Sequence, residues 1–153
     1  MKRPDLLNTY PTNSKMLQTN ESSMKSSEDS NYGYELVLDL HSCDKSKFNR
    51  PSIDRFFIKL CELIEMERCE VHFWDDIGVP PEDQQTLPHT KGTSAVCFIL
   101  TSSIVVHTLD LLEAAYVNIF SCKPFDPAAA RQFTQDWFGA KTCRDSLLTR
   151  TLR

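Results

Sequence analysis

Ser102 opens a stretch in which a hydroxyl, an imidazole and a thiol follow one another. His107 comes five residues after Ser102, and Cys122 comes fifteen residues after His107. A hydrolase would place its serine in a G-x-S-x-G turn, and neither glycine is present around Ser102. Glycine-rich phosphate-binding motifs are absent too, in a chain with only four glycines. These residue types instead suit a reaction in which the serine attacks its own chain.

A serine hydroxyl can attack the carbonyl carbon of the residue before it, which converts the peptide bond into an ester. Elimination then breaks the chain and leaves the serine as a pyruvoyl group, a ketone that can form an imine with an amine substrate. Such self-cleavage needs a constrained turn and a nearby acid or base. A thiol suits the later step, in which the carbanion left by decarboxylation is protonated.

The same residues resemble the small pyruvoyl-dependent S-adenosylmethionine decarboxylases of bacteria and archaea. That family has a serine, then His-Thr, then a cysteine after Phe-Thr or Phe-Ser, and this chain matches in register without a gap. A Gly-x-Ser eight residues before the serine is matched by Gly92-Thr93-Ser94. The segments "YELVLDLHSCD" and "CKPFDPAAARQF" resemble the family's first strand and its Asp-Pro-capped helix. The resemblance covers roughly residues 33 to 139.

This resemblance implies a proenzyme that cleaves itself between Thr101 and Ser102 and works as a homodimer. Ser102 would become the covalent pyruvoyl cofactor that binds the amine of the substrate. His107 would act as acid or base in self-processing with help from Ser94, and Cys122 would protonate the product carbon. The implied substrate is S-adenosylmethionine, and the decarboxylated product would enter spermidine synthesis.

Two positions after His107-Thr108 differ from the family, which has Trp and Glu there to help hold the nucleoside. This chain has Leu109 and Leu111, and Asp110 or Glu113 are the nearest residues that could compensate. Two alternatives therefore stay open. One is a pyruvoyl-dependent decarboxylase of a free amino acid such as arginine or ornithine. The other is a non-processing homologue that acts as a binding or regulatory subunit.

The elements that must position these residues follow from hydrophobic periodicity. Strands are predicted at 34–40, 69–76, 93–101, 103–109 and 114–122, with either a short strand or a fraying end at 141–148. One helix begins at Pro51 or Ser52 and buries one face, which comprises Ile53, Phe56, Phe57, Leu60 and Ile64. A second helix has Asp126 as N-cap and Gly139 as the residue after its end, with Phe133 and Trp137 on its inner face. This order predicts an α+β fold, a two-layer sandwich with a mainly antiparallel sheet and two helices on one face.

Residues 1–32 are rich in Ser, Asn and Thr, which predicts a disordered tail before a single domain at 33–153. The segment 76–92 reads as a long loop, of a length that is often functional. Trp74 to Asp76 either ends a strand or faces a pocket. The net charge of −4 argues against a nucleic-acid partner, and no apolar run is long enough to span a membrane.

The N-terminal segment has no apolar core of a secretory signal, so we expect a cytoplasmic protein with reduced thiols. None of the six cysteines forms a C-x-x-C pair, and the histidines lack partners at ligand spacing. The sequence therefore predicts no metal site.

Overall fold

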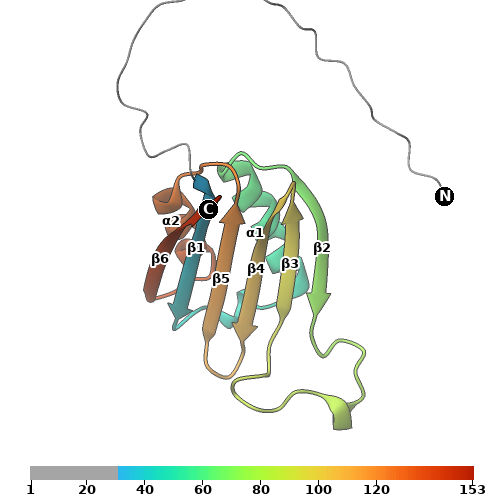
Figure 1. Ribbon diagram of the computed structural model, residues 1–153. Helices are drawn as coiled ribbons and strands as arrows, with labels where there is room; N and C mark the ends of the chain where they lie inside the picture. Colours follow the sequence, from blue (N-terminus) through green and yellow to red (C-terminus); the bar gives the residue numbers. More distant parts are fainter. Residues whose placement is uncertain (1–30) are drawn as a thin grey trace, which may run out of the picture.

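Six antiparallel strands form one sheet, and two helices cover one of its faces (Figure 1). The strands are β1 Asn31–His41, β2 Arg68–Trp74, β3 Ser94–Ile99, β4 Ser102–Leu109, β5 Ala114–Ser121 and β6 Thr142–Thr151. The helices are α1 Arg50–Leu63 and α2 Pro127–Trp137, with short 3-10 turns at Lys45–Lys47 and Pro81–Asp83. The strand order across the sheet is β2-β3-β4-β5-β1-β6. The predicted α+β two-layer sandwich is confirmed.

This computed structural model describes residues 31–153, so the predicted disordered tail lies outside the described residues except for its last two. Asn31 and Tyr32 belong to β1, which begins two residues before the predicted start of the domain. The C-terminal segment, predicted as a short strand or a fraying end, is the ten-residue strand β6. It pairs with β1 along its length and is the edge strand on that side of the sheet.

Both helices begin at polar caps. The Asn49 side chain accepts a hydrogen bond from the backbone N–H of Ser52, so α1 starts slightly before the predicted residue. Asp126 caps α2 as predicted by accepting from the N–H groups of Ala128 and Ala129, and Gly139 follows the helix with a φ of 58°. Neither helix is both long and apolar enough to cross a membrane in the part of the chain that the structure describes.

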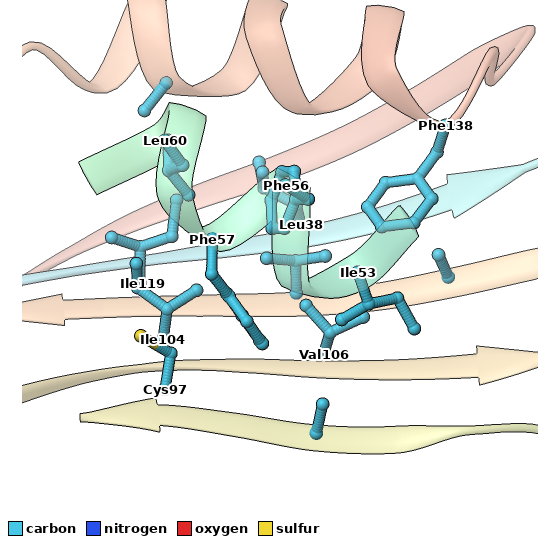
Figure 2. Close-up of a cluster of buried hydrophobic side chains, with 14 of the residues drawn as sticks. Leu38, Ile53, Phe56, Phe57, Leu60, Cys97, Ile104, Val106, Ile119 and Phe138 are labelled. Carbon is cyan, nitrogen blue, oxygen red and sulfur yellow. The ribbon is translucent and has the colours of Figure 1, made fainter. Parts of the chain in front are cut away.

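The core lies between the helices and the sheet (Figure 2). Phe56 of α1 lies at the centre of this core. Its ring centroid is 5.1 Å from that of Phe138 and 5.9 Å from that of Phe133, and these contacts join α1 to α2. From the sheet, alternate residues of β4 such as Ile104 and Val106 are fully buried beneath the helices. This packing fixes which face of each central strand points away from solvent.

The opposite face of the sheet carries no helix among the described residues (Figure 1). Its side chains alternate with the buried ones along β3, β4 and β5. Large apolar side chains lie on it, and Phe98 is 47% exposed. We call this surface the open face, and it carries much of the candidate site.

Candidate active site

The turn between β3 and β4 consists of Leu100 and Thr101, directly before Ser102. Thr101 has a φ of 60°, a left-handed conformation that is unfavourable for a β-branched residue. Glycine is the usual residue where a turn requires such a φ. The bond between Thr101 and Ser102, where cleavage is predicted, therefore follows a strained residue.

Ser102 contacts Cys122, although twenty residues separate them. The antiparallel pairing of β4 with β5 places the segment after Ser121 beside the β3–β4 turn. The backbone N–H of Cys122 donates to Ser102 Oγ at 3.0 Å, and the Ser102 hydroxyl lies 3.5 Å from Cys122 Sγ. Ser102 itself is buried, with 7% of its surface exposed. The structure thus brings together two of the four site residues that the sequence predicts.

Thr101 joins this pair through its side chain, a contact that no sequence pattern indicates. Its Oγ1 lies 3.1 Å from Cys122 Sγ, within hydrogen-bonding distance. Hydrogen bonds from Thr101 and then from Ser102 lower the pKa of the Cys122 thiol below its ordinary value, while burial opposes them. Thr101, Ser102 and Cys122 together are called the Ser102 end.

Ser94 and His107 form a second pair. They lie opposite each other on β3 and β4, and Ser94 Oγ is 2.8 Å from His107 Nδ1. A hydroxyl at this distance can fix the orientation of the imidazole ring, which leaves Nε2 to exchange a proton with another group. Both side chains belong to the open face, and the pair is called the His107 end.

The two ends are far apart within one chain. Ser102 and His107 are five residues apart on the same strand, which corresponds to about 16 Å. Because side chains alternate along a strand, Ser102 points toward the helix layer and His107 toward the open face. His107 therefore cannot touch Ser102 of its own chain.

Gly92 and Thr93 hold the His107 end together. A Cβ on Gly92 would overlap the backbone carbonyl of Thr108, so only glycine lets the two segments approach this closely. The N–H of Thr93 then donates to Thr108 Oγ1 at 3.1 Å, and Thr108 N–H donates to the Thr93 carbonyl at 2.9 Å. These contacts explain the Gly-x-Ser spacing, since they place Ser94 opposite His107.

A cleft of about 380 Å³ opens beside the His107 end. Its aromatic walls come from Trp74, which is 62% exposed at the end of β2, and from Tyr116 on β5. The long loop after β2 contributes Gln85, His89 and Thr90. Trp74 thus faces a pocket, and the loop lines the cleft. The length of the loop indicated a functional role, but no sequence pattern selected its individual lining residues. Tyr116 was missed, although its outward position in the alternation of β5 was a usable signal.

A second cleft, of about 390 Å³, lies at the Ser102 end. Its apolar walls include Phe98 and Phe120, and Thr101 and Ser102 belong to it. No Asp, Glu, Lys or Arg lines this cleft or the one at the His107 end in the described chain. Both clefts therefore offer aromatic and neutral polar surface.

The two carboxylates that could compensate for Leu109 and Leu111 do not line the His107-end cleft. Glu113 forms an ion pair with Lys45 at 3.3 Å. Asp110 belongs to a neighbouring charged cleft that also includes Arg50 and Lys91, and burial raises the pKa of its carboxyl group. Within residues 31–153 no group of three or more His, Cys, Asp or Glu side chains is arranged to hold a metal ion.

Comparisons with known proteins point to one family. The family model described as S-adenosylmethionine decarboxylase matches residues 34–151. Among solved structures, the fold is similar to the crystal structure of the adenosylmethionine decarboxylase from Aquifex aeolicus VF5, with a TM-score of 0.65 and 17% sequence identity. That match covers 81% of this chain and 94% of the other. A search of curated proteins finds no match.

Proposed function

Since the chain belongs to the S-adenosylmethionine decarboxylase family, we propose that it cleaves itself between Thr101 and Ser102 and then decarboxylates S-adenosylmethionine. The observation that carries this proposal is the contact between Ser102 and Cys122 directly after the left-handed Thr101. A nucleophile, a strained acyl donor and a thiol meet there, as self-cleavage and a later protonation require. The decarboxylated product would serve an aminopropyl transfer such as spermidine synthesis.

Self-cleavage begins when Ser102 Oγ attacks the carbonyl carbon of Thr101. The C–O bond forms, the C–N bond breaks, and an ester replaces the peptide. Loss of the Cα proton of Ser102 then breaks the bond between its Cβ and the ester oxygen, so that Thr101 leaves as a free carboxylate. Water finally displaces the nitrogen, which departs as ammonia, and a ketone remains. His107 suits the removal of that Cα proton, because Ser94 orients its ring.

The residues at the Ser102 end fit a pyruvoyl group. Ser102 begins a strand, and the Cys122 N–H already donates to its side chain. When formed, such a group supplies a ketone that draws electrons away from the bond to the substrate carboxylate. Cys122 would hold the proton that the product carbon receives, since its thiol is nearest to Ser102.

A second copy of the chain would complete the site. Ser102 and His107 cannot meet within one chain, yet each end opens to a cleft of similar size. The open face also leaves Trp74 and Phe98 partly exposed, which suits burial against a second sheet. We therefore infer a homodimer in which the Ser102 end of one copy meets the His107 end of the other.

The lining of the clefts favours S-adenosylmethionine over arginine or ornithine. An adenine ring can stack on Trp74 or Tyr116, and a sulfonium cation is attracted to aromatic faces. A guanidinium or ammonium side chain would instead require a carboxylate partner, and none lines either cleft in the described chain. Trp74 and Tyr116 also supply the aromatic contacts that Leu109, which stands where the family has Trp, cannot make.

Intact-mass measurement of the purified protein tests self-cleavage. We expect two pieces, residues 1–101 and 102–153, the smaller one with a blocked N-terminus. Ser102→Ala should leave the 17.6 kDa chain uncut, while the matched control Ser103→Ala should still be cut. An uncut wild-type chain would instead favour a binding or regulatory subunit.

Release of carbon dioxide from carboxyl-labelled substrates tests the substrate. We expect release from S-adenosylmethionine and none from arginine or ornithine. The reverse result would keep the pyruvoyl chemistry and assign the protein to a free amino acid.

A further inference from the structure

We propose that Cys122 also acts before the enzyme is mature, as the base that takes the proton from Ser102 Oγ, and that Thr101 is the positioning residue that holds Cys122 for this step. The inference rests on the proposed self-cleavage and assigns its first proton transfer. It goes beyond the role in turnover that the sequence predicts for Cys122.

Geometry selects Cys122 for this task. Its Sγ lies 3.5 Å from Ser102 Oγ and 3.1 Å from Thr101 Oγ1. The backbone N–H of Cys122 donates to Ser102 Oγ at 3.0 Å, which fixes the hydroxyl beside the thiol. His107 lies at the other end of β4, so it cannot take this proton within the chain. Among the described residues, Cys122 is the titratable side chain that contacts Ser102.

Hydrogen bonds, rather than neighbouring charges, lower the pKa of the Cys122 thiol. The pKa of Cys122 is lowered first by Thr101 and then by Ser102, so more thiolate is present at neutral pH than for an ordinary cysteine. The nearby titratable groups are Tyr32 and Tyr34 on β1, which flank the close contact of Gly33 with Cys122, and Cys69 on β2, which lines the Ser102-end cleft.

On its own segment, Cys122 is followed by Lys123. The Lys123 ammonium donates to the Glu65 backbone carbonyl at 3.3 Å, and Lys123 is not among the causes of the lowered pKa of Cys122. The hydrogen bond with Thr101 is therefore the largest influence on the pKa of the Cys122 thiol.

The proposed step balances as a proton shuttle. Cys122 thiolate takes the proton of Ser102 Oγ as the oxygen bonds to the Thr101 carbonyl carbon. The C–N bond then breaks, and the new thiol returns the proton to the departing amine of Ser102. The product is an ester and an amine, with Cys122 back as thiolate. His107 from a second copy would act only in the elimination that follows.

The His107→Ala chain isolates this first step, because elimination should stop there and leave the ester. Hydroxylamine cleaves esters and leaves peptide bonds, so hydroxylamine-dependent cleavage between residues 101 and 102 reports ester formation. We would synthesise the chain in a cell-free system and measure this rate between about pH 6 and pH 9.5. The rate should rise with pH and level off above the pKa of Cys122, which lies below the ordinary 9.0.

Two substitutions test the assigned roles. Cys122→Ser should slow ester formation by roughly 100-fold and remove the inflection in this pH range. Thr101→Val, which removes the hydroxyl but keeps the shape, should move the inflection to higher pH, whereas Thr101→Ser should keep it. Cys143→Ser is the matched control, because this partly exposed thiol lies on β6 opposite Leu40 and lines neither cleft, so the substitution should leave the profile unchanged.

The outcomes separate the inference from the proposed function. A wild-type chain that never cleaves overturns both. A wild-type chain that cleaves, with an unchanged pH profile in Cys122→Ser and Thr101→Val, overturns only the inference. Because Thr101→Val changes one exposed turn residue, it keeps the test decisive even where Cys122→Ser fails to fold.

Discussion

Ser102 and His107 lie on the same strand but point to opposite faces of the sheet, five residues apart. Ser102 is buried on the face of β4 that points toward the helices, whereas His107 is exposed on the open face. Each is instead paired with a residue of another strand or segment, Cys122 and Ser94 respectively. The arrangement divides the candidate site into two ends that one chain cannot unite.

Two inactive variants should therefore restore each other. Under the proposed self-cleavage, Ser102→Ala would lack the nucleophile and His107→Ala the elimination base, so neither should be cut when expressed alone. In the proposed dimer, a mixed pair would bring Ser102 of the His107→Ala copy to His107 of the Ser102→Ala copy, which would leave one site intact. We expect the His107→Ala chain to be cut only in the mixture, as read by intact mass with differently tagged copies.

Expression of each variant alone is the control for this complementation. A His107→Ala chain that stays uncut in verified mixed dimers would show that the two ends do not meet across copies.

Trp74 should contribute to substrate binding, because its ring is a largely exposed wall of the His107-end cleft. Base stacking on an aromatic side chain contributes about 1–3 kcal/mol. Trp74→Ala should raise KM for S-adenosylmethionine by roughly 5- to 150-fold, and Trp74→Phe should raise it much less. Leu147→Ala, on the distant strand β6, is the control for loss of an exposed apolar side chain. Equal KM values for Trp74→Ala and the wild type would remove Trp74 from the binding site.

Thr101→Gly should stabilise the precursor, since glycine adopts a φ of 60° without steric cost. In the uncut Ser102→Ala background, the free energy of unfolding should rise by about 1 kcal/mol in urea titrations. Self-cleavage in the otherwise wild-type chain should slow, because relief of strain and loss of the contact with Cys122 act in the same direction. A faster cut in Thr101→Gly would contradict both reasons.

Gly92→Ala should be costly because its Cβ would overlap the backbone of Thr108. We expect a loss of about 2–4 kcal/mol in the free energy of unfolding, together with slower processing, because Thr108 is next to His107. Gly78→Ala is a matched contrast, since Gly78 has a φ of 82° but nothing within 4 Å of an added Cβ. It should cost only about 1 kcal/mol. Similar losses in both variants would argue against the close approach at Gly92.

Arg50 and Asp75 tie the start of α1 to the end of β2, where the long loop begins. The guanidinium donates to both carboxylate oxygens, at 2.8 Å and 2.6 Å, and this holds the pKa of Asp75 below its ordinary value of 3.8. The stabilisation is therefore present above pH 3.8 and is lost as the pH falls through the lower folded pKa.

At pH 7, Asp75→Asn should cost about 1 kcal/mol, because the arginine is partly solvated. The difference from wild type should shrink in urea titrations carried out below pH 3.8. A difference that stays constant at all pH values would mean that the charge of Asp75 is not its cause.

Many local features could be predicted from the residues alone. Asp126 and Gly139 set the ends of α2, because capping depends on a few neighbouring groups. The alternation in β1 and the helical spacing of Phe56 and Phe57 likewise identified buried faces. The site residues were chosen by their types and spacing, and these roles stay predictions.

Other features depended on contacts between distant segments. The strand at 142–151 was uncertain in the sequence, because both of its faces are largely exposed and only pairing with β1 defines it. The left-handed φ of Thr101 and its contact with Cys122 follow from how the β3–β4 turn meets the end of β5. No local pattern around a threonine indicates such a conformation.

By itself, the sequence determined which residues are candidates for the reaction and most of the elements that carry them, because residue types, caps and periodicity act over a few positions. Only the tertiary structure decided that Ser102 meets Cys122 and Thr101, while His107 meets Ser94 at the other end of the sheet. The physical reason is that strand pairing sets neighbours across long separations, and helix packing sets which face of β4 is covered.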